Sequence, residues 1–322
     1  EVQGRNLDAR SRRNLASHIS RDISQINSVT PSKTNSLHMK TVKPAASIKS
    51  YASQQGLSSE ELIHRFTITS MEIYCNCEDG KLPDPTYDEV HLIVLATDDV
   101  RSGDEHEARA RFFNVIVVGS KSECPKKLVS SLGQWQKKVV IDIVDTENDL
   151  FSRLIEIFRV INADVICGYD VQRDSLGYLL SRAKSLDIPL EESLSRLPGE
   201  KPSTLSEFEN QYSTDHESGI FITGRIVLNL WRRMRSELKL NNYSLGNVCW
   251  HLLAKPVPQF TSTQLRRWFE INPHQRQCQT QSVTRARTIR HIIRLAEVNL
   301  QLMESLDLVR RTCESARLYG ID

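Results

Sequence analysis

Two clusters of arginine residues have the clearest potential for chemistry, because guanidinium groups bind phosphate oxygens through paired N–H donors. In the first cluster, which surrounds Trp231, Arg232 and Arg235 are three residues apart and so share a helix face. The first cluster comprises Arg225, Arg232, Arg233, Arg235 and Lys239, and the second comprises Arg285, Arg287, Arg290 and Arg294. For both clusters a solvated helix face is the favoured interpretation, and contact with phosphate groups is the alternative.

The overall composition indicates that any binding of nucleic acid depends on these local clusters. The 322 residues include 42 basic and 40 acidic side chains, a net charge of +2 that excludes a binder acting through bulk charge. The seven cysteines show no repeated spacing, which favours free thiols in a reducing compartment. No apolar run in the sequence approaches the roughly 18–20 residues of a membrane span.

The elements that must position these side chains begin after a polar N-terminal segment. Residues 1–58 are rich in Ser, Lys, Arg, Asn and Gln, which predicts a disordered linker. Alternating apolar residues then predict a β-meander with strands at residues 66–75, 91–97, 112–118 and 139–144. In the first strand, Met71 and Ile73 fall on one face, and Ile68, Glu72 and Tyr74 fall on the other.

Helices alternate with strands in the rest of the chain. Thr146 followed by Asp149 predicts a capped helix start, and Leu150 and Leu154 begin its apolar face. A long polar loop is expected at residues 189–218. The remaining expected strands are residues 165–168 and 221–228, and the helices are residues 175–187, 230–240, 244–254, 263–269 and 284–316. This order predicts a mixed α/β sheet flanked by helices.

Five segments in the same order and spacing resemble the exonuclease region of B-family DNA polymerases. The first reads Ile-Cys-Gly-Tyr-Asp-Val-Gln-Arg-Asp-Ser-Leu-Gly-Tyr-Leu-Leu and resembles the second exonuclease motif. The five segments are residues 166–180, 224–231, 243–253, 302–306 and 316–320. The resemblance implies a ribonuclease-H-like fold of the DnaQ-type 3′–5′ exonuclease class over residues 60–306. Residues 307–322 would then begin the connection to a polymerase palm that lies outside this chain.

Shorter segments point to one branch of that family. Residues 70–73 (Ser-Met-Glu-Ile), 228–232 (Leu-Asn-Leu-Trp-Arg) and 306–309 (Leu-Asp-Leu-Val) most resemble the zeta branch, whose members extend primers in translesion synthesis. The delta and epsilon branches keep the acids of the exonuclease site. Loss of those acids therefore supports the resemblance to the zeta branch.

In active members of the family, four acids hold two divalent cations, one to activate water and one to stabilise the leaving oxygen. The resemblance places the first two acids at Glu72 and Tyr74, on alternate positions of one strand. The second motif would supply its acid at Ser175, with Asp170 at a position where the family has asparagine.

The third motif normally ends in a tyrosine and an aspartate, which the resemblance places at His291 and Leu295. Only Glu72 of the four metal-binding positions therefore keeps an acid. Mg²⁺ requires oxygen ligands in near-octahedral geometry, so neutral and basic side chains are no substitute. We expect no catalytic residue and no bound metal in this segment, with a single weak metal between Glu72 and Asp170 as the alternative.

Two neighbouring acids could compensate only if they turned toward the cleft. Asp174 precedes Ser175, and Glu297 lies two residues after Leu295. With about 100° of rotation per helical residue, both should face away from the site. Asp174 is expected instead to act as a helix N-cap or to interact with the helix dipole.

The resemblance implies that the chain is part of a nuclear DNA-directed DNA polymerase of translesion synthesis, with this segment in an architectural role along the DNA channel. The implied cofactors of the whole protein are Mg²⁺ in the palm and a C-terminal 4Fe–4S cluster. Its implied partners are a DNA primer–template, a HORMA-domain accessory subunit and the small subunits shared with polymerase delta. The candidates for DNA contact are Arg225, Arg232, Arg235, Arg290 and Arg294. An active 3′–5′ exonuclease with rearranged carboxylates and a stand-alone single-strand-binding module are the alternatives.

Overall fold

The computed structural model describes residues 66–77, 81–99, 110–119, 125–197, 218–270 and 278–320. All of these ranges belong to one structural unit, His64–Asp322. The disordered linker predicted for residues 1–58 lies outside the described residues.

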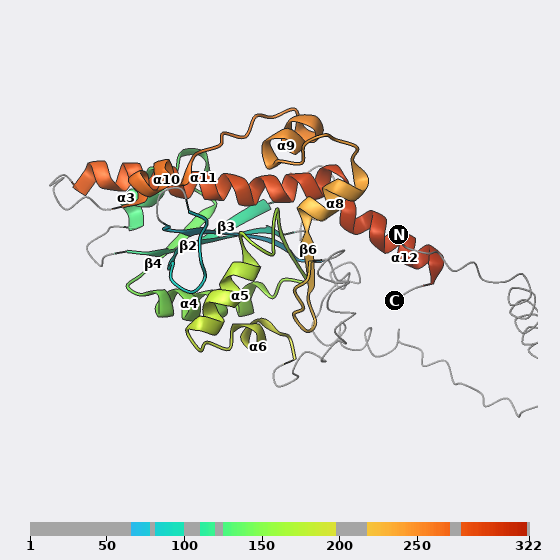
Figure 1. The fold of residues 1–322 in the computed structure, drawn as a ribbon, viewed down its shortest axis with the longest axis horizontal. Coiled ribbons are helices and arrows are strands. Elements are labelled where there is room, and N and C mark those ends of the chain that lie inside the picture. Colours follow the sequence, from blue (N-terminus) through green and yellow to red (C-terminus); the bar gives the residue numbers. More distant parts are fainter. Residues whose placement is uncertain are drawn as a thin grey trace, which may run out of the picture. The chain divides into compact units, whose positions relative to one another are not determined.

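Six strands form a mixed sheet in the order β4-β3-β2-β1-β5-β6 (Figure 1). Their bounds are β1 (Ile68–Cys75), β2 (Val90–Asp99), β3 (Ala110–Val118), β4 (Val139–Val144), β5 (Val165–Gly168) and β6 (Ile226–Asn229). The first three strands pair antiparallel, as the predicted meander requires. The prediction is wrong for β4, which runs parallel to β3 because a helical connection returns the chain to the starting edge. β5 and β6 continue the sheet in parallel from β1.

Most of the expected helices are present. Their bounds are α3 (Pro125–Ser130), α4 (Glu147–Ile161), α5 (Leu176–Ser185), α6 (Leu190–Leu194), α8 (Leu230–Glu237), α9 (Leu245–Leu253), α10 (Ser262–Phe269), α11 (Cys278–Ser305) and α12 (Leu308–Tyr319), with a short 3₁₀ helix at Gly133–Trp135. At the start of α4 the Thr146 hydroxyl accepts a hydrogen bond from the backbone N–H of Asp149, which confirms the predicted cap.

Three expectations about these elements are wrong. Helix α6 lies where a polar loop was expected, and its buried residues Leu190 and Leu194 are spaced one helical turn apart. Strand β6 begins only at Ile226, because the preceding segment folds back on itself. The single helix expected over residues 284–316 is divided into α11 and α12 at Asp307, whose φ of 45° is left-handed.

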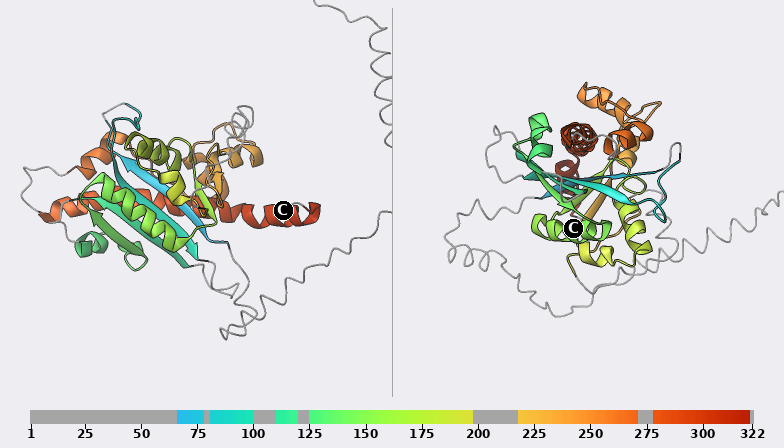
Figure 2. Two further views of the ribbon diagram at one scale, coloured as in Figure 1. Left: turned by 90° about the horizontal axis from the view of Figure 1, so that it is seen from below. Right: turned by 90° about the vertical axis from the view of Figure 1, so that its left-hand side faces the viewer.

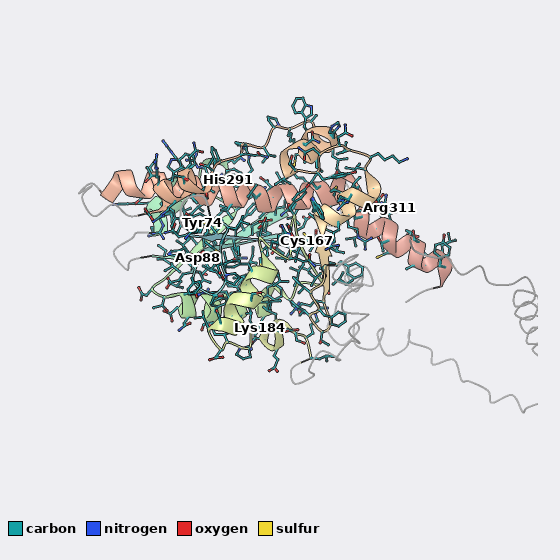
Figure 3. All side chains as sticks on the ribbon, in the orientation of Figure 1. Tyr74, Asp88, Cys167, Lys184, His291 and Arg311 are labelled. Carbon is teal, nitrogen blue, oxygen red and sulfur yellow. The ribbon has the colours of Figure 1, made fainter. Side chains whose placement is uncertain are left out.

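Helices cover both faces of the sheet (Figure 2). Two apolar cores lie between the helices and the sheet, one on each face. Helices α4, α5 and α6 cover one face, where Met71 and Ile73 of β1 are packed. Helix α11, with α8, α9 and α10, covers the other face, where Ile68 and Tyr74 are packed. In Figure 3, His291 lies on the α11 side of the sheet and Lys184 on the α5 side. The predicted alternation of β1 is therefore confirmed.

This mixed sheet with helices on both faces is the ribonuclease-H-like architecture expected from the sequence. It brings the ends of β1 and β5, the turn before α5 and the inner face of α11 together. Among the described helices, none has the length and apolar composition that crossing a bilayer requires.

A buried ion pair fixes the α4–α5 side to the loop that precedes β2. The Arg182 guanidinium donates hydrogen bonds of 2.8 Å and 3.0 Å to the Glu147 carboxylate. The same guanidinium donates to the carbonyl of Thr86 at 3.0 Å, and Glu147 accepts from the backbone N–H of Val90 at 2.8 Å. Both side chains are at most 10% exposed, so neither charge has water as a substitute partner.

We predict that Arg182→Met lowers the free energy of unfolding by about 3 kcal/mol or more, because it leaves the Glu147 carboxylate buried without its partner. Arg153→Met is the matched control, since Arg153 pairs with Asp142 and Glu156 at a site where its side chain is 41% exposed. We expect the control to cost about 1 kcal/mol or less. Urea denaturation of both variants measures the two values, and equal losses would contradict the prediction.

Candidate functional site

Glu72 is a buried carboxyl group between β1 and α11. It is 8% exposed, and its Oε1 accepts a hydrogen bond of 2.5 Å from Nδ2 of Asn299. The same amide nitrogen donates to Oγ of Ser70 at 3.1 Å. Burial raises the pKa of Glu72 to about 7, the Asn299 hydrogen bond opposes this shift, and the charge of Asp174 adds to it. The carboxyl group is therefore partly protonated at neutral pH.

Asn299 escapes notice in the sequence because it matches no family motif and contacts residues more than 200 positions away. The signal that the sequence offers for Asn299 is its position on helix α11. It lies one helical turn after Leu295, so it extends the same face toward β1. An amide donor thus faces Glu72 close to Leu295, the position where the family pattern places the acid of its third motif.

The other degenerate positions are packed as core residues. The Tyr74 ring is 7% exposed and lies against the Phe269 ring, with centroids 4.9 Å apart, and its burial raises the pKa of the phenol. Leu295 packs against the apolar core beneath α11. Ser175 is buried at the start of α5, where its Oγ has no hydrogen-bond partner among the described residues. None of these three side chains offers an anionic oxygen.

Asp170 and Asp174 lie in the turn between β5 and α5. The backbone N–H of Asp174 donates to the carbonyl of Asp170 at 3.0 Å. Burial raises the pKa of Asp174, and the charge of Asp170 adds to the increase. The N-cap of α5 is Ser175, so Asp174 does not cap this helix, and its alternative role opposite the helix dipole stays a prediction.

Asp174 was expected to face away from the site, yet it lies near enough for its charge to add to the raised pKa of Glu72. The reason is local geometry: residues 169–174 form turns, to which the rotation of 100° per helical residue does not apply. Glu297 behaves as expected and faces elsewhere, since its carboxylate accepts a hydrogen bond of 3.2 Å from Nε1 of Trp135.

The surroundings of Glu72 do not fit the two-metal centre of an active exonuclease. The polar groups near this point are the partly protonated carboxyl group of Glu72, the amide nitrogen that donates a hydrogen bond to it, and the two acids of the adjacent turn. Within the described ranges, no three His, Cys, Asp or Glu side chains gather in a way that could hold a metal ion. Paired Mg²⁺ ions require several ionised oxygens that converge on one point.

The first arginine cluster does not form one surface. Arg225 is directed into the fold: its Nε donates to the carbonyl of Leu194 at 2.6 Å, and its guanidinium lies 4.8 Å from the centre of the Phe158 ring. Burial lowers the pKa of Arg225 to about 10. This geometry makes Arg225 a structural residue and does not favour it as a DNA contact.

Arg232 and Arg235 leave α8 in different directions. Nη2 of Arg232 donates to the side-chain carbonyl of Gln172 at 3.1 Å, beside the turn that carries Asp170. Arg235 is exposed and lies 4.8 Å from the centre of the Trp231 ring. The two residues therefore do not act as one phosphate-binding pair, although Arg232 borders the cleft.

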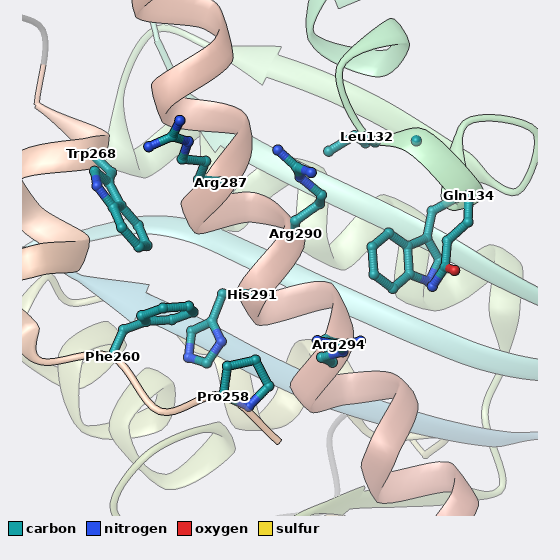
Figure 4. A pocket seen from close by; sticks show the side chains of 11 residues that line it. Leu132, Gln134, Pro258, Phe260, Trp268, Arg287, Arg290, His291 and Arg294 are labelled. Atoms are coloured by element: carbon teal, nitrogen blue, oxygen red, sulfur yellow. The ribbon is translucent and has the colours of Figure 1, made fainter. Parts of the chain in front are cut away.

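The second arginine cluster divides between the core and a pocket. Arg285 is 3% exposed and lies 4.3 Å from the centre of the Phe269 ring, with its guanidinium donating to the carbonyl of Val118. Arg290 and Arg294 line a pocket of about 590 Å³ on the outer side of α11, together with His291 (Figure 4). Burial, followed by the charge of Arg294, lowers the pKa of His291 to about 4, so this imidazole is neutral at pH 7.

A family model described as DNA polymerase family B, exonuclease domain, matches residues 16–248. The chain belongs to this family. Among curated family B proteins, it is 31% identical over 281 residues to the DNA polymerase zeta catalytic subunit of Mus musculus, a match that covers 83% of this chain and 9% of the relative. The match to the Arabidopsis thaliana zeta catalytic subunit is 30% identical over 283 residues and covers 80% and 14%. The Homo sapiens zeta catalytic subunit is 30% identical over 281 residues, with 83% and 8% covered.

The chain spans about a tenth of the length of these family B relatives. The resemblance to the zeta branch that the sequence motifs indicate is confirmed by these matches. The assignment of individual residues to DNA contact stays a prediction.

The raised pKa of Glu72 predicts a specific dependence of stability on pH. The folded-state pKa of about 7 lies above the ordinary glutamate value of 4.5, so the folded state holds the proton more tightly than the unfolded state. Stability is then fully present below about pH 4.5 and falls as the pH rises through 7. Glu72→Gln keeps an oxygen for Asn299 and removes the titration.

We expect Glu72→Gln to be about 3 kcal/mol more stable than the parent protein at pH 8, from a pKa difference of 2–3 units at 1.36 kcal/mol each. At pH 4.5 the two proteins should have nearly equal stability. Urea denaturation across this pH range measures the difference between them, which cancels the titration of other groups. A difference that does not vary with pH would contradict the burial of an ionisable Glu72.

Proposed function

We propose that this chain is the exonuclease-like part of the catalytic subunit of a zeta-type translesion DNA polymerase, and that it no longer removes nucleotides. The observation that carries the proposal is the environment of Glu72. This acid remains at the family position, yet an amide of α11 holds it, burial raises its pKa, and the other three positions carry Tyr74, Ser175 and Leu295.

Loss of editing suits an enzyme that extends damaged or mismatched primer ends. An active 3′–5′ exonuclease would remove those ends before extension. The domain would keep its packed sheet and helices because they form one wall of the DNA channel. Its role in the whole enzyme would therefore be architectural, with the exposed Arg235 as a candidate DNA contact.

The properties of the whole protein belong to the same proposal. It would be a nuclear DNA-directed DNA polymerase acting on a primer–template in translesion synthesis. Mg²⁺ would be held in its palm and a 4Fe–4S cluster near its C-terminus, both outside this segment. A HORMA-domain subunit and polymerase-delta-type small subunits would bind elsewhere on the protein. The similarity to zeta catalytic subunits supports these assignments.

A second candidate, an active exonuclease with rearranged acids, is favoured by one observation. The charges of Asp174 and Asp170 both act on Glu72, so three carboxyl groups lie within electrostatic range of one another. Such a group could attract a cation if it lost its protons together. The raised pKa values of Glu72 and Asp174 oppose that arrangement at neutral pH.

We predict that the purified chain removes no 3′ nucleotides from labelled single-stranded DNA in the presence of Mg²⁺ or Mn²⁺. Glu72→Ala and Asp170→Asn/Asp174→Asn serve as comparisons, and Glu156→Ala on the exposed face of α4 is the matched control. The four proteins should give the same background. Metal-dependent shortening that disappears in the Glu72 and Asp170/Asp174 variants, but persists in the control, would establish the second candidate instead.

A further inference from the structure

A pocket on the outer side of α11 combines cationic and aromatic side chains. Its volume of about 590 Å³ lies within the range of pockets that bind small molecules. One wall comes from Phe260 and Trp268 at α10, and the opposite wall from residues 132–135 after α3. Figure 4 shows α11 running between these walls, with Arg287, Arg290 and Arg294 along it.

The cations of the pocket form one row. Arg287, Arg290 and Arg294 are spaced three and four residues apart, so they follow one face of α11 over about 10 Å. Arg287 and Arg294 are exposed, whereas Arg290 is partly buried, and its Nε has no hydrogen-bond partner among the described residues. No acidic side chain is among the described residues that line the pocket. The row therefore presents an excess of positive charge and hydrogen-bond donors.

The aromatic wall provides flat apolar surface beside this row. The Phe260 ring packs edge to face against both Trp268 and His291, with ring centroids 4.9 Å apart in each pair. These contacts hold the rings in place without an occupant. His291 stays neutral at pH 7, and its buried Nδ1 has no hydrogen-bond partner among the described residues. The wall thus offers a stacking surface for an aromatic heterocycle.

The pocket is separate from the Glu72 cleft. Asn299, which reaches Glu72, lies about two helical turns beyond His291 and is rotated by about 150° from the centre of the arginine row. Binding in the pocket also does not depend on the proposed loss of nuclease activity. An occupant here would therefore be recognised independently of any nuclease chemistry.

We propose that this pocket binds a nucleotide unit, with phosphate groups on Arg290 and Arg294 and the base against the Trp268–Phe260 wall. Guanidinium groups match phosphate oxygens in geometry and charge, and bases stack on aromatic side chains whatever their sequence. The unit is either a free nucleoside triphosphate or one nucleotide of a single-stranded DNA segment. Both sources have the same recognition chemistry, so the experiment must separate them.

The test measures binding of dATP and of a short oligothymidylate to the full 322-residue chain by titration calorimetry, with pyrophosphate and deoxyadenosine as partial ligands. The main variant is Arg290→Glu/Arg294→Glu. The matched control is Arg310→Glu/Arg317→Glu, which reverses two exposed charges on α12. Arg290→Lys/Arg294→Lys keeps the charge, and Trp268→Leu removes the stacking surface. Thermal unfolding of each variant verifies that it is folded.

We expect saturable binding that weakens at least tenfold in Arg290→Glu/Arg294→Glu and in Trp268→Leu, and that persists in the control and largely in the lysine variant. For two phosphate contacts on a single strand, the logarithm of the affinity should fall with the logarithm of salt with a slope of about −1.4. Reversal of the two charges should flatten that slope. Binding of dATP alone identifies a free nucleotide as the ligand, and binding of the oligonucleotide alone identifies single-stranded DNA.

Three results would overturn the proposal. These are no saturable binding of either nucleotide probe, unchanged affinity in the folded glutamate variant, and pyrophosphate binding as tight as dATP with no effect of Trp268→Leu. None of them depends on the nuclease assay, because Arg290 and Arg294 lie outside the Glu72 cleft. Failure of the nucleotide site and failure of the proposed function are therefore distinguishable.

Discussion

The packing of α11 over β1 determines the ionisation state of Glu72. The inner face of α11 is apolar, and it removes water from the strand that carries Glu72. A carboxylate in that position stays ionised only if cations or several hydrogen-bond donors replace the lost water. Glu72 receives an amide donor from Asn299 but also the repulsion of nearby acids, and desolvation is the largest influence on its pKa.

Metal ions and clustered acids depend on each other in such a site. Acids that converge without a metal raise one another's pKa, and a metal without enough ionised acids has too few ligands. At two of the family's acid positions, Tyr74 and Leu295 supply no carboxylate. They therefore neither bind a metal ion nor raise the pKa of a neighbouring acid by repulsion. These two side chains instead contact the core beneath α11, Tyr74 against Phe269 of α10. At these two positions the site therefore contributes apolar packing.

Local patterns predicted those features that depend on neighbouring residues. The alternation of Met71 and Tyr74 gives the two faces of β1, and Thr146 with Asp149 marks the start of α4. The direction of β4 was missed because it depends on how the connection from β3 crosses the sheet. The break at Asp307 was missed because no Gly or Pro marks it, although the residue adopts a left-handed conformation.

The candidate site was less predictable, because its contacts join distant segments. The family motifs located Glu72, yet its partner Asn299 is 227 residues away and has no motif. Likewise, the pattern of charges in the sequence does not show which arginine side chains point into the fold and which point toward solvent. Arg225 and Arg235 belong to the same basic cluster, yet the first binds backbone carbonyls inside the fold and the second is exposed and lies against the Trp231 ring.

The outer face of α11 presents the opposite physical problem from its inner face. Like charges spaced three or four residues apart destabilise a helix by about 0.2–0.5 kcal/mol per pair, and the row from Arg287 to Arg294 contains two such pairs. Arg285, on the same helix, contacts a carbonyl and an aromatic ring and so contributes to packing. The pocket arginines have no acid among the described lining residues to offset their repulsion. The neutral state of His291 limits that repulsion without removing it, whereas a phosphate group between Arg290 and Arg294 would turn it into attraction.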